Sequence, residues 1–144
     1  MKNFKFSRLF AAVLFVAVLG LTSCVQPASL VPGDIEGTWT SAYDEKYVIT
    51  DESIKEAAWD TWAIEIEDST EISDNSGIIY GKLTKGSEWT PAGDYYAVAY
   101  KALTENSVQL SSAAVSYKTL EEVMKNYSKL DDFAYYSECA KAAE

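Results

Sequence analysis

The stretch TWAIEIE, residues 61–67, indicates the fold of this 144-residue chain. Its apolar residues Trp62, Ile64 and Ile66 alternate with small or acidic residues. Successive side chains of a β-strand point to opposite faces of the sheet, so this period of two predicts a strand with one buried and one solvated face. The chain is therefore expected to build a β-sheet with its core on one side.

Short segments with the composition of strands lie on both sides of this stretch. They are rich in β-branched and aromatic residues, and turn residues separate them at regular intervals. The further strands are expected at residues 38–43, 46–50, 78–85, 95–103, 107–114 and 132–139. Residues 53–62 are expected to form a helical turn or two, and residues 68–77 and 86–94 to form loops. This pattern predicts a mainly β protein, a small antiparallel β-barrel or sandwich of about seven to eight strands.

One segment near the C-terminus, residues 119–127, breaks this pattern. Thr119 and Glu122 have the spacing of a helix capping box. The apolar residues of the segment follow at i, i+3, i+4 and i+7: Leu120, Val123, Met124 and Tyr127. We expect one short amphipathic helix here, covering an open end or a flank of the sheet.

The N-terminal residues indicate export. Three basic residues among the first eight precede an uncharged apolar run at residues 9–21, which is typical of a signal peptide and shorter than the ~20 residues of a membrane span. The sequence LTSC at residues 21–24 resembles the lipobox of bacterial lipoproteins, in which the cysteine is lipidated and becomes the new N-terminus. The resemblance implies that Cys24 carries a lipid anchor. An ordinary signal peptide with a cysteine at its border is the alternative.

The lipobox resemblance divides the chain into three parts: a signal peptide at residues 1–23, a lipidated cysteine with a tether at residues 24–36, and a single β-rich domain at residues 37–144. Val25 stands where some lipoprotein-sorting systems place the acidic residue that retains a lipoprotein in the inner membrane. We therefore expect an exported protein anchored in the outer membrane rather than the inner, with the membrane as a partner through the lipid on Cys24.

The charge balance argues against a nucleic-acid partner. The chain has 22 acidic and 12 basic residues, and three of the basic residues lie in the signal peptide, so the remainder carries a net charge of −13. Binding to phosphates needs a basic surface, which this composition does not supply. A solvated acidic surface is the expected outcome.

The residue types available also argue against an enzyme, a cofactor or a metal site. The chain has no histidine, and Cys139 is the only thiol beside Cys24. Glu65 and Glu67 lie on one strand face and are expected to be solvated rather than to act as an acid and a base. Residues 74–77, DNSG, have ordinary turn chemistry rather than the spacing of a calcium loop. Cys139 is expected to be buried, with an intermolecular disulfide as the alternative.

Gly37, Thr38 and Trp39 resemble the G-x-W signature of lipocalins and related ligand-binding barrels. In that family the tryptophan packs across the closed base of the barrel. Asp94 and Tyr95 resemble part of the lipocalin T-D-Y motif, while the arginine of the third signature has no counterpart after the signal peptide. The whole region after the signal peptide is also similar to a group of uncharacterised spirochaete lipoproteins, a resemblance that implies no activity.

Two functions follow as expectations for a membrane-anchored, non-enzymatic lipoprotein. The first is a carrier or binding module for an apolar small molecule. Its expected ligand-binding residues are Trp39, Trp62, Tyr96 and Tyr100. The alternative is an adhesin-like or assembly lipoprotein that binds an envelope or host protein, with Trp89 of the loop at residues 86–94 in the interface.

Overall fold

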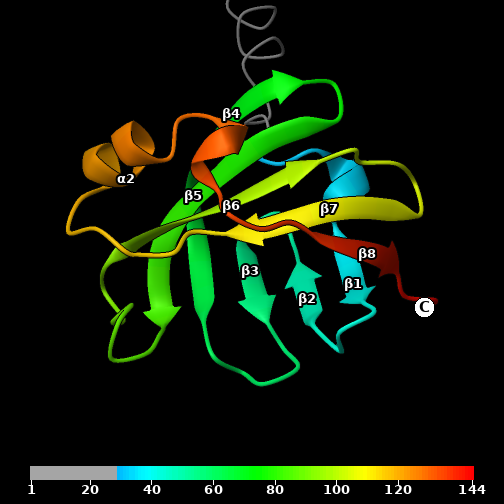
Figure 1. The fold of residues 1–144 in the computed structure, drawn as a ribbon, viewed down its shortest axis with the longest axis horizontal. Helices are drawn as coiled ribbons and strands as arrows, with labels where there is room; N and C mark the ends of the chain where they lie inside the picture. Colours follow the sequence, from blue (N-terminus) through cyan, green and yellow to red (C-terminus); the bar gives the residue numbers. More distant parts are fainter. Residues whose placement is uncertain (1–28) are drawn as a thin grey trace, which may run out of the picture.

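Eight antiparallel strands close into a barrel in the computed structural model, which describes residues 29–144 (Figure 1). The strands are β1 (Gly37–Ser41), β2 (Lys46–Ile49), β3 (Ser53–Glu56), β4 (Ala63–Ser73), β5 (Ser76–Lys85), β6 (Tyr95–Lys101), β7 (Ser107–Ser112) and β8 (Ser137–Lys141). Each strand pairs with the next one in the sequence, and β8 pairs with β1. The prediction of a small antiparallel barrel is confirmed, and its sandwich alternative is not.

The inside of the barrel is the core of the molecule. On β4, Ile64 and Ile66 are buried and Glu65 and Glu67 are exposed, as their alternation predicts. The strand pairing places Ile64 opposite Leu83 of β5, and opposite an isoleucine of β3 on its other side. Burial of each such side chain stabilises the fold by about 1.5–3 kcal/mol.

The predicted helix near the C-terminus is confirmed as α2 (Leu120–Asn126). Thr119 and Glu122 form both hydrogen bonds of the capping box, which satisfies backbone N–H groups at the start of the helix. The capping box and the apolar stripe of this helix both lie within residues 119–127. The position of the helix could therefore be predicted without knowledge of the barrel.

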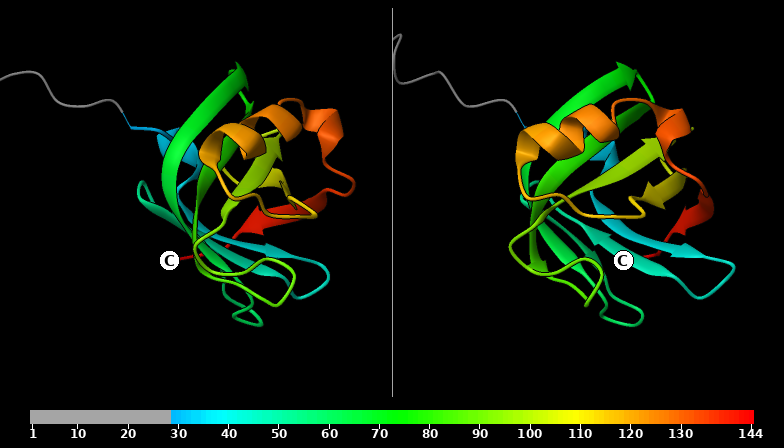
Figure 2. Two further views of the ribbon diagram at one scale, coloured as in Figure 1. Left: turned by 90° about the vertical axis from the view of Figure 1, so that its left-hand side faces the viewer. Right: turned by 60° about the vertical axis from the view of Figure 1, so that its left-hand side comes forward.

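The helix lies on the outside of β5 and β6 (Figure 2). Val123 is fully buried there, and the hydroxyl of Tyr80 on β5 donates a hydrogen bond of 2.6 Å to the carbonyl oxygen of Tyr127. The outward Ala97 and Ala99 of β6 are also buried. The helix therefore covers a flank of the sheet, and a second apolar layer forms outside the barrel.

The helical turns expected at residues 53–62 do not form. Ser53–Glu56 is strand β3 instead, with Ile54 opposite both Ile49 of β2 and Ile64 of β4. The apolar residues of this segment have helical spacing, but the segment is short. Hydrogen bonding to β2 on one side and to β4 on the other stabilises the extended conformation instead. Residues 57–62 form the connection to β4.

The polar loop expected at residues 68–77 is a long hairpin instead. β4 continues to Ser73 and β5 begins at Ser76, so only two residues form the turn. The pairing shifts register between Ile66 and Asp68, which lets the polar second half of β4 keep pairing with β5. Backbone hydrogen bonds extend the strand where side-chain hydrophobicity would not predict it.

The barrel has two ends, which we call the base and the loop end. The base includes the 3₁₀-helix η1 (Gly33–Ile35), the hairpin between β4 and β5, and the chain after β8. The loop end includes the connections at residues 42–45, 57–62, 86–94 and 113–136, the last of which contains α2 and the 3₁₀-helix η2 (Leu130–Asp132). The first three of these connections lie along the lower edge of Figure 1.

Trp39 closes the base. Its side chain is fully buried, and its indole N–H donates a hydrogen bond of 2.7 Å to the carbonyl oxygen of Ile35. Lys141 places its ammonium group 5.2 Å from the centre of the Trp39 ring system. Val31 and Ile35 belong to the core, so the last part of the segment assigned to a tether packs against the barrel.

The signal peptide at residues 1–23 and the proposed anchor Cys24 lie outside the described residues, and both stay predictions. Among residues 29–144, no helix has the length and apolar character needed to cross a membrane.

Candidate functional site

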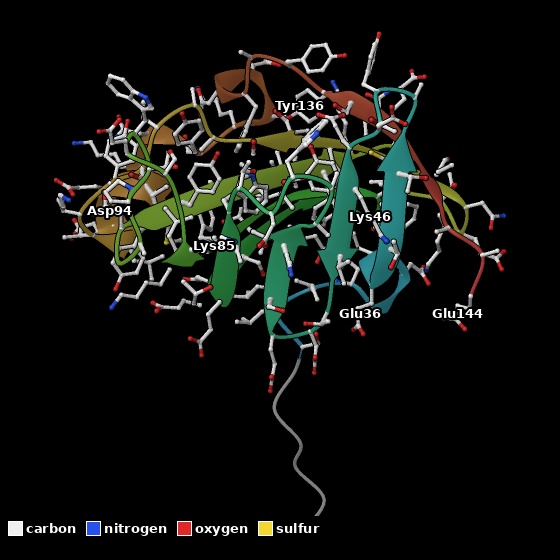
Figure 3. The ribbon with its side chains drawn as sticks, turned by 90° about the horizontal axis from the view of Figure 1, so that it is seen from below. Glu36, Lys46, Lys85, Asp94, Tyr136 and Glu144 are labelled. Carbon is white, nitrogen blue, oxygen red and sulfur yellow. The ribbon has the colours of Figure 1, made fainter. Side chains whose placement is uncertain are left out.

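Each of the four connections at the loop end carries one exposed aromatic side chain. They are Tyr43, Trp59, Trp89 and Tyr135, and each is between 60 % and 85 % exposed. Among residues 29–144, no other aromatic side chain is exposed to this extent. Figure 3 views the barrel from this side, with Asp94 labelled in the β5–β6 connection. The exposed aromatic surface of the described chain is therefore gathered at one end.

Polar side chains hold the β1–β2 turn that presents Tyr43. The hydroxyl of Ser41 donates to the carboxylate of Glu45 at 2.7 Å and accepts from the backbone N–H of Tyr43 at 3.2 Å. Asp44 has a φ of 63°, a left-handed conformation that tightens the turn. The turn is fixed by contacts within a few residues of the exposed ring.

A buried carboxylate holds the β3–β4 connection that presents Trp59. Glu56 points into the barrel, and its carboxylate accepts hydrogen bonds from the backbone N–H groups of Ala58, Trp59 and Thr61 at 2.8–3.2 Å. The hydroxyl of Thr61 donates to it at 2.9 Å. Burial acts to raise the pKa of Glu56, but these hydrogen bonds outweigh it and hold the pKa below its ordinary value.

The β5–β6 connection that presents Trp89 is held at two places. The hydroxyl of Ser87 accepts from the backbone N–H groups of Trp89 and Thr90, both at 3.3 Å. At the end of the connection, buried Asp94 accepts from the ammonium of Lys118 at 2.7 Å and from the hydroxyl of Ser116 at 2.9 Å. The hydrogen bond from Lys118, together with the smaller one from Ser116, holds the pKa of Asp94 below its ordinary value despite burial.

Further contacts join the connections to one another. Asp60 of the β3–β4 connection forms ion pairs with Lys55 of β3 and with Lys85 at the end of β5. The contacts of Asp94 join the β5–β6 connection to the start of the β7–β8 connection. Desolvation, together with the hydroxyl of Tyr43, raises the pKa of the exposed Tyr135.

The four residues predicted to bind a ligand do not form one site. Trp62 and Tyr96 face the inside of the barrel near the loop end, with ring centres 5.4 Å apart, and Tyr47 extends this row at 6.3 Å from Trp62. Trp39 lies at the base, and Tyr100 lines a pocket of about 240 Å³ beside residues 29–32. The structure thus brings together only two of the four.

Four aromatic residues of this end were not predicted from the sequence as site residues: Tyr47, Tyr43, Trp59 and Tyr135. The alternation of residues 46–50 places Tyr47 on the same strand face as Ile49, so its inward position had a usable signal. The three exposed rings had a weaker sequence signal, which is that each lies close to a turn and near an acidic residue.

Cys139 is buried in β8 and forms no disulfide. Burial, with a smaller contribution from the charge of Glu45, raises the pKa of its thiol to about 12. The thiol is therefore protonated at neutral pH and is a poor nucleophile. Glu65 and Glu67 are exposed on the outer face of β4. Within residues 29–144, no group of three or more potential ligand residues is placed to hold a metal ion.

Comparison of the chain with protein-family models, with curated proteins and with solved structures found no match.

Proposed function

We propose that this protein is a membrane-anchored, non-enzymatic recognition protein that binds a partner protein of the envelope or of a host through the loop end of the barrel. The observation that carries this proposal is the presence of one exposed aromatic side chain on each of the four connections at that end. This develops the alternative expected from the sequence, in which Trp89 was the only interface residue.

The chemistry of the loop end favours a protein partner. Tyrosine and tryptophan supply large contact areas with few rotatable bonds, and they are enriched among the residues that dominate binding energy. The hydrogen bonds of Ser41, Glu56 and Ser87 hold the loops before any partner arrives. Loops held in this way lose less conformational entropy on binding, so more of the contact energy appears as affinity.

The charges beside the aromatic rings argue against the loop end as a lipid-binding surface. Asp44 adjoins Tyr43 and Glu88 adjoins Trp89, and both acidic residues are exposed. Anionic lipid head groups repel carboxylates, whereas the membrane-binding surfaces of proteins are usually basic. A protein with positive charge around an apolar patch complements this end better.

The position of the proposed anchor is consistent with this role. The first described residue, Ser29, adjoins the base, since residues 31 and 35 pack there. Ser29 follows Cys24 by five positions in the chain, which limits the distance between them to about 18 Å. A lipid on Cys24 would therefore keep the base close to the membrane and the loop end away from it.

The carrier function stays a prediction. An apolar molecule entering from the loop end would have to separate the packed rings of Trp62, Tyr96 and Tyr47 or fill the space beside them. A change in tryptophan fluorescence with an apolar dye, lost in Trp62→Phe, would support it.

The proposed function is tested by capture of partners on the whole protein in detergent, with quantitative mass spectrometry of the bound proteins. The double variant Trp59→Ala/Trp89→Ala should lose a defined partner that the wild type retains. Ile72→Ala is the matched control, because Ile72 is an exposed apolar side chain on the β4–β5 hairpin at the base. An identical set of captured proteins for all three would contradict the proposal, provided that near-ultraviolet circular dichroism shows the double variant to be folded.

A further inference from the structure

The connection between β3 and β4 is wound around a single buried carboxylate. Glu56 is only 4 % exposed, and it accepts from the backbone N–H groups of Ala58, Trp59 and Thr61 and from the hydroxyl of Thr61. Within residues 29–144, every hydrogen bond formed by the backbone of residues 58–61 ends on this carboxylate. One side chain therefore fixes the loop that presents Trp59.

Little else holds this loop. Residues 58–61 are all exposed, so buried apolar surface contributes little to their position. Asp60 forms ion pairs with Lys55 and Lys85, but these side chains are about half exposed and such pairs are weak. Asp60 also has a φ of 53°, a left-handed conformation that costs free energy for a residue other than glycine. The loop is expected to leave this conformation when the carboxylate stops accepting.

The surroundings of Glu56 contain no charge that would hold it ionised in acid. Tyr47 of β2 lies directly opposite Glu56, and burial, with a smaller contribution from the charge of Glu45, raises the pKa of Tyr47, so its hydroxyl stays neutral. Lys46 and Lys55 are exposed and lie on the outer face, because side chains alternate along each strand. Within the described residues, Glu56 forms no ion pair.

Glu56 differs in this respect from the group that holds Trp89. The backbone N–H groups of Trp89 and Thr90 donate to the hydroxyl of Ser87, which does not titrate in the acid range. Burial acts to raise the pKa of Glu56, but the hydrogen bonds from the loop hold it below the ordinary value of 4.5. Glu56 therefore becomes protonated only below pH 4.5, and the loop at Trp59 responds to acid where the loop at Trp89 does not.

We infer that the β3–β4 connection is an acid-released loop, in which protonation of Glu56 frees residues 57–61, and Trp59 with them, while the barrel stays closed. A protonated carboxyl group is itself a donor at one oxygen, so it cannot accept from all of the groups that the carboxylate serves. The strands on both sides of the connection keep their pairing, which does not depend on Glu56 being charged.

The consequence for binding rests on the proposed function. Trp59 contributes to binding without an entropic cost only while its loop is held in place. A freed loop has to be ordered again before Trp59 can contact the partner, so the affinity should fall in acid. Glu56 is thus a positioning residue for Trp59, and its ionisation regulates the loop end.

The inference is tested by fluorine nuclear magnetic resonance on the whole protein in detergent, with 5-fluorotryptophan at its four tryptophan positions. Trp59→Phe identifies the signal of position 59. We expect this signal to move and to sharpen in a transition with a midpoint below pH 4.5, because freed residues move faster. The signals of positions 39 and 89 should stay where they are. A signal of position 59 that moves only together with that of position 39 would report unfolding of the barrel and overturn the inference.

Variants of the connection should change this transition. Thr61→Val removes one donor to the ionised carboxylate at an exposed position, so the midpoint should rise by about one pH unit. Glu56→Gln should show the acid position of the signal at neutral pH and no transition. Asp60→Asn is the matched control, because it removes the other carboxylate of the connection and should keep the transition. An unchanged midpoint in Thr61→Val, or loss of the transition in Asp60→Asn, would overturn the inference.

Capture of the partner at a series of pH values separates this inference from the proposed function. Thr61→Val should release the partner at a higher pH than the wild type, and equal release would overturn the link between the loop and binding. Absence of the transition, while Trp59→Ala/Trp89→Ala loses its partner, would overturn the acid-released loop and leave the proposed function standing. A transition at position 59, while that double variant keeps every partner, would overturn the proposed function instead.

Discussion

At the scale of single residues, Glu56 is the least expected feature of the molecule. Acidic side chains were expected on the solvated surface, yet Glu56 is buried at the loop end of the barrel. A buried carboxylate is tolerated when several donors satisfy it, and the donors here are backbone N–H groups of the next connection. Such donors cannot be seen in a sequence, because they depend on how the chain turns after β3.

The depressed pKa of Glu56 predicts how stability depends on pH. Because the pKa in the folded state lies below the ordinary value of 4.5, the stabilisation is complete above pH 4.5 and is lost as the pH falls through the folded value. Glu56→Gln should lower the free energy of unfolding by about 1–3 kcal/mol at neutral pH. In urea denaturation at a series of pH values, the free energy of unfolding of this variant should fall less steeply toward acid pH than that of the wild type. Glu65→Gln, on the exposed outer face, should follow the wild type. Parallel pH curves for Glu56→Gln and the wild type would contradict the assignment.

At the scale of elements, secondary structure could be predicted from the sequence where the residues that determine it are close together in the chain. The helix at α2 was predicted because its cap and its apolar stripe lie within nine consecutive residues. Strand β3 was not predicted, because its four residues form a strand only when Ile54 and its neighbours pair with β2 and β4. The second half of β4 was missed for a similar reason, because its polar residues are held by pairing with β5 rather than by burial.

The pairing of β4 with β5 depends on Gly81. A Cβ atom at this position would overlap the backbone carbonyl oxygen of Glu65, beside the shift of register at Ile66. We expect Gly81→Ala to destabilise the protein by about 3 kcal/mol or more, because backbone atoms on both strands would have to move. Gly33→Ala is the matched control: a Cβ atom there meets no atom within 4 Å, and the change should stay within about 0.5 kcal/mol. Equal midpoints in urea denaturation for the two variants would contradict this role of Gly81.

At the scale of the whole molecule, the order of the strands explains the candidate site. In a barrel whose strands pair in sequence order, every second connection lies at the same end, so the first, third, fifth and seventh connections meet. Those connections carry Tyr43, Trp59, Trp89 and Tyr135. The barrel could be predicted from the sequence, but residues 53–62 were expected to form helical turns, which left one strand fewer than the structure has. The grouping of the aromatic residues could not be derived from that count.

The central claim is that the loop end meets the partner and the base does not. The most direct measurement is photo-cross-linking in intact cells, with a photoreactive phenylalanine analogue introduced at position 89 of the loop end or at position 72 of the base. Both native side chains are exposed, so neither replacement disturbs the core. The account predicts a discrete cross-linked protein from position 89 and none from position 72. A discrete cross-linked protein from position 72 and none from position 89 would contradict it.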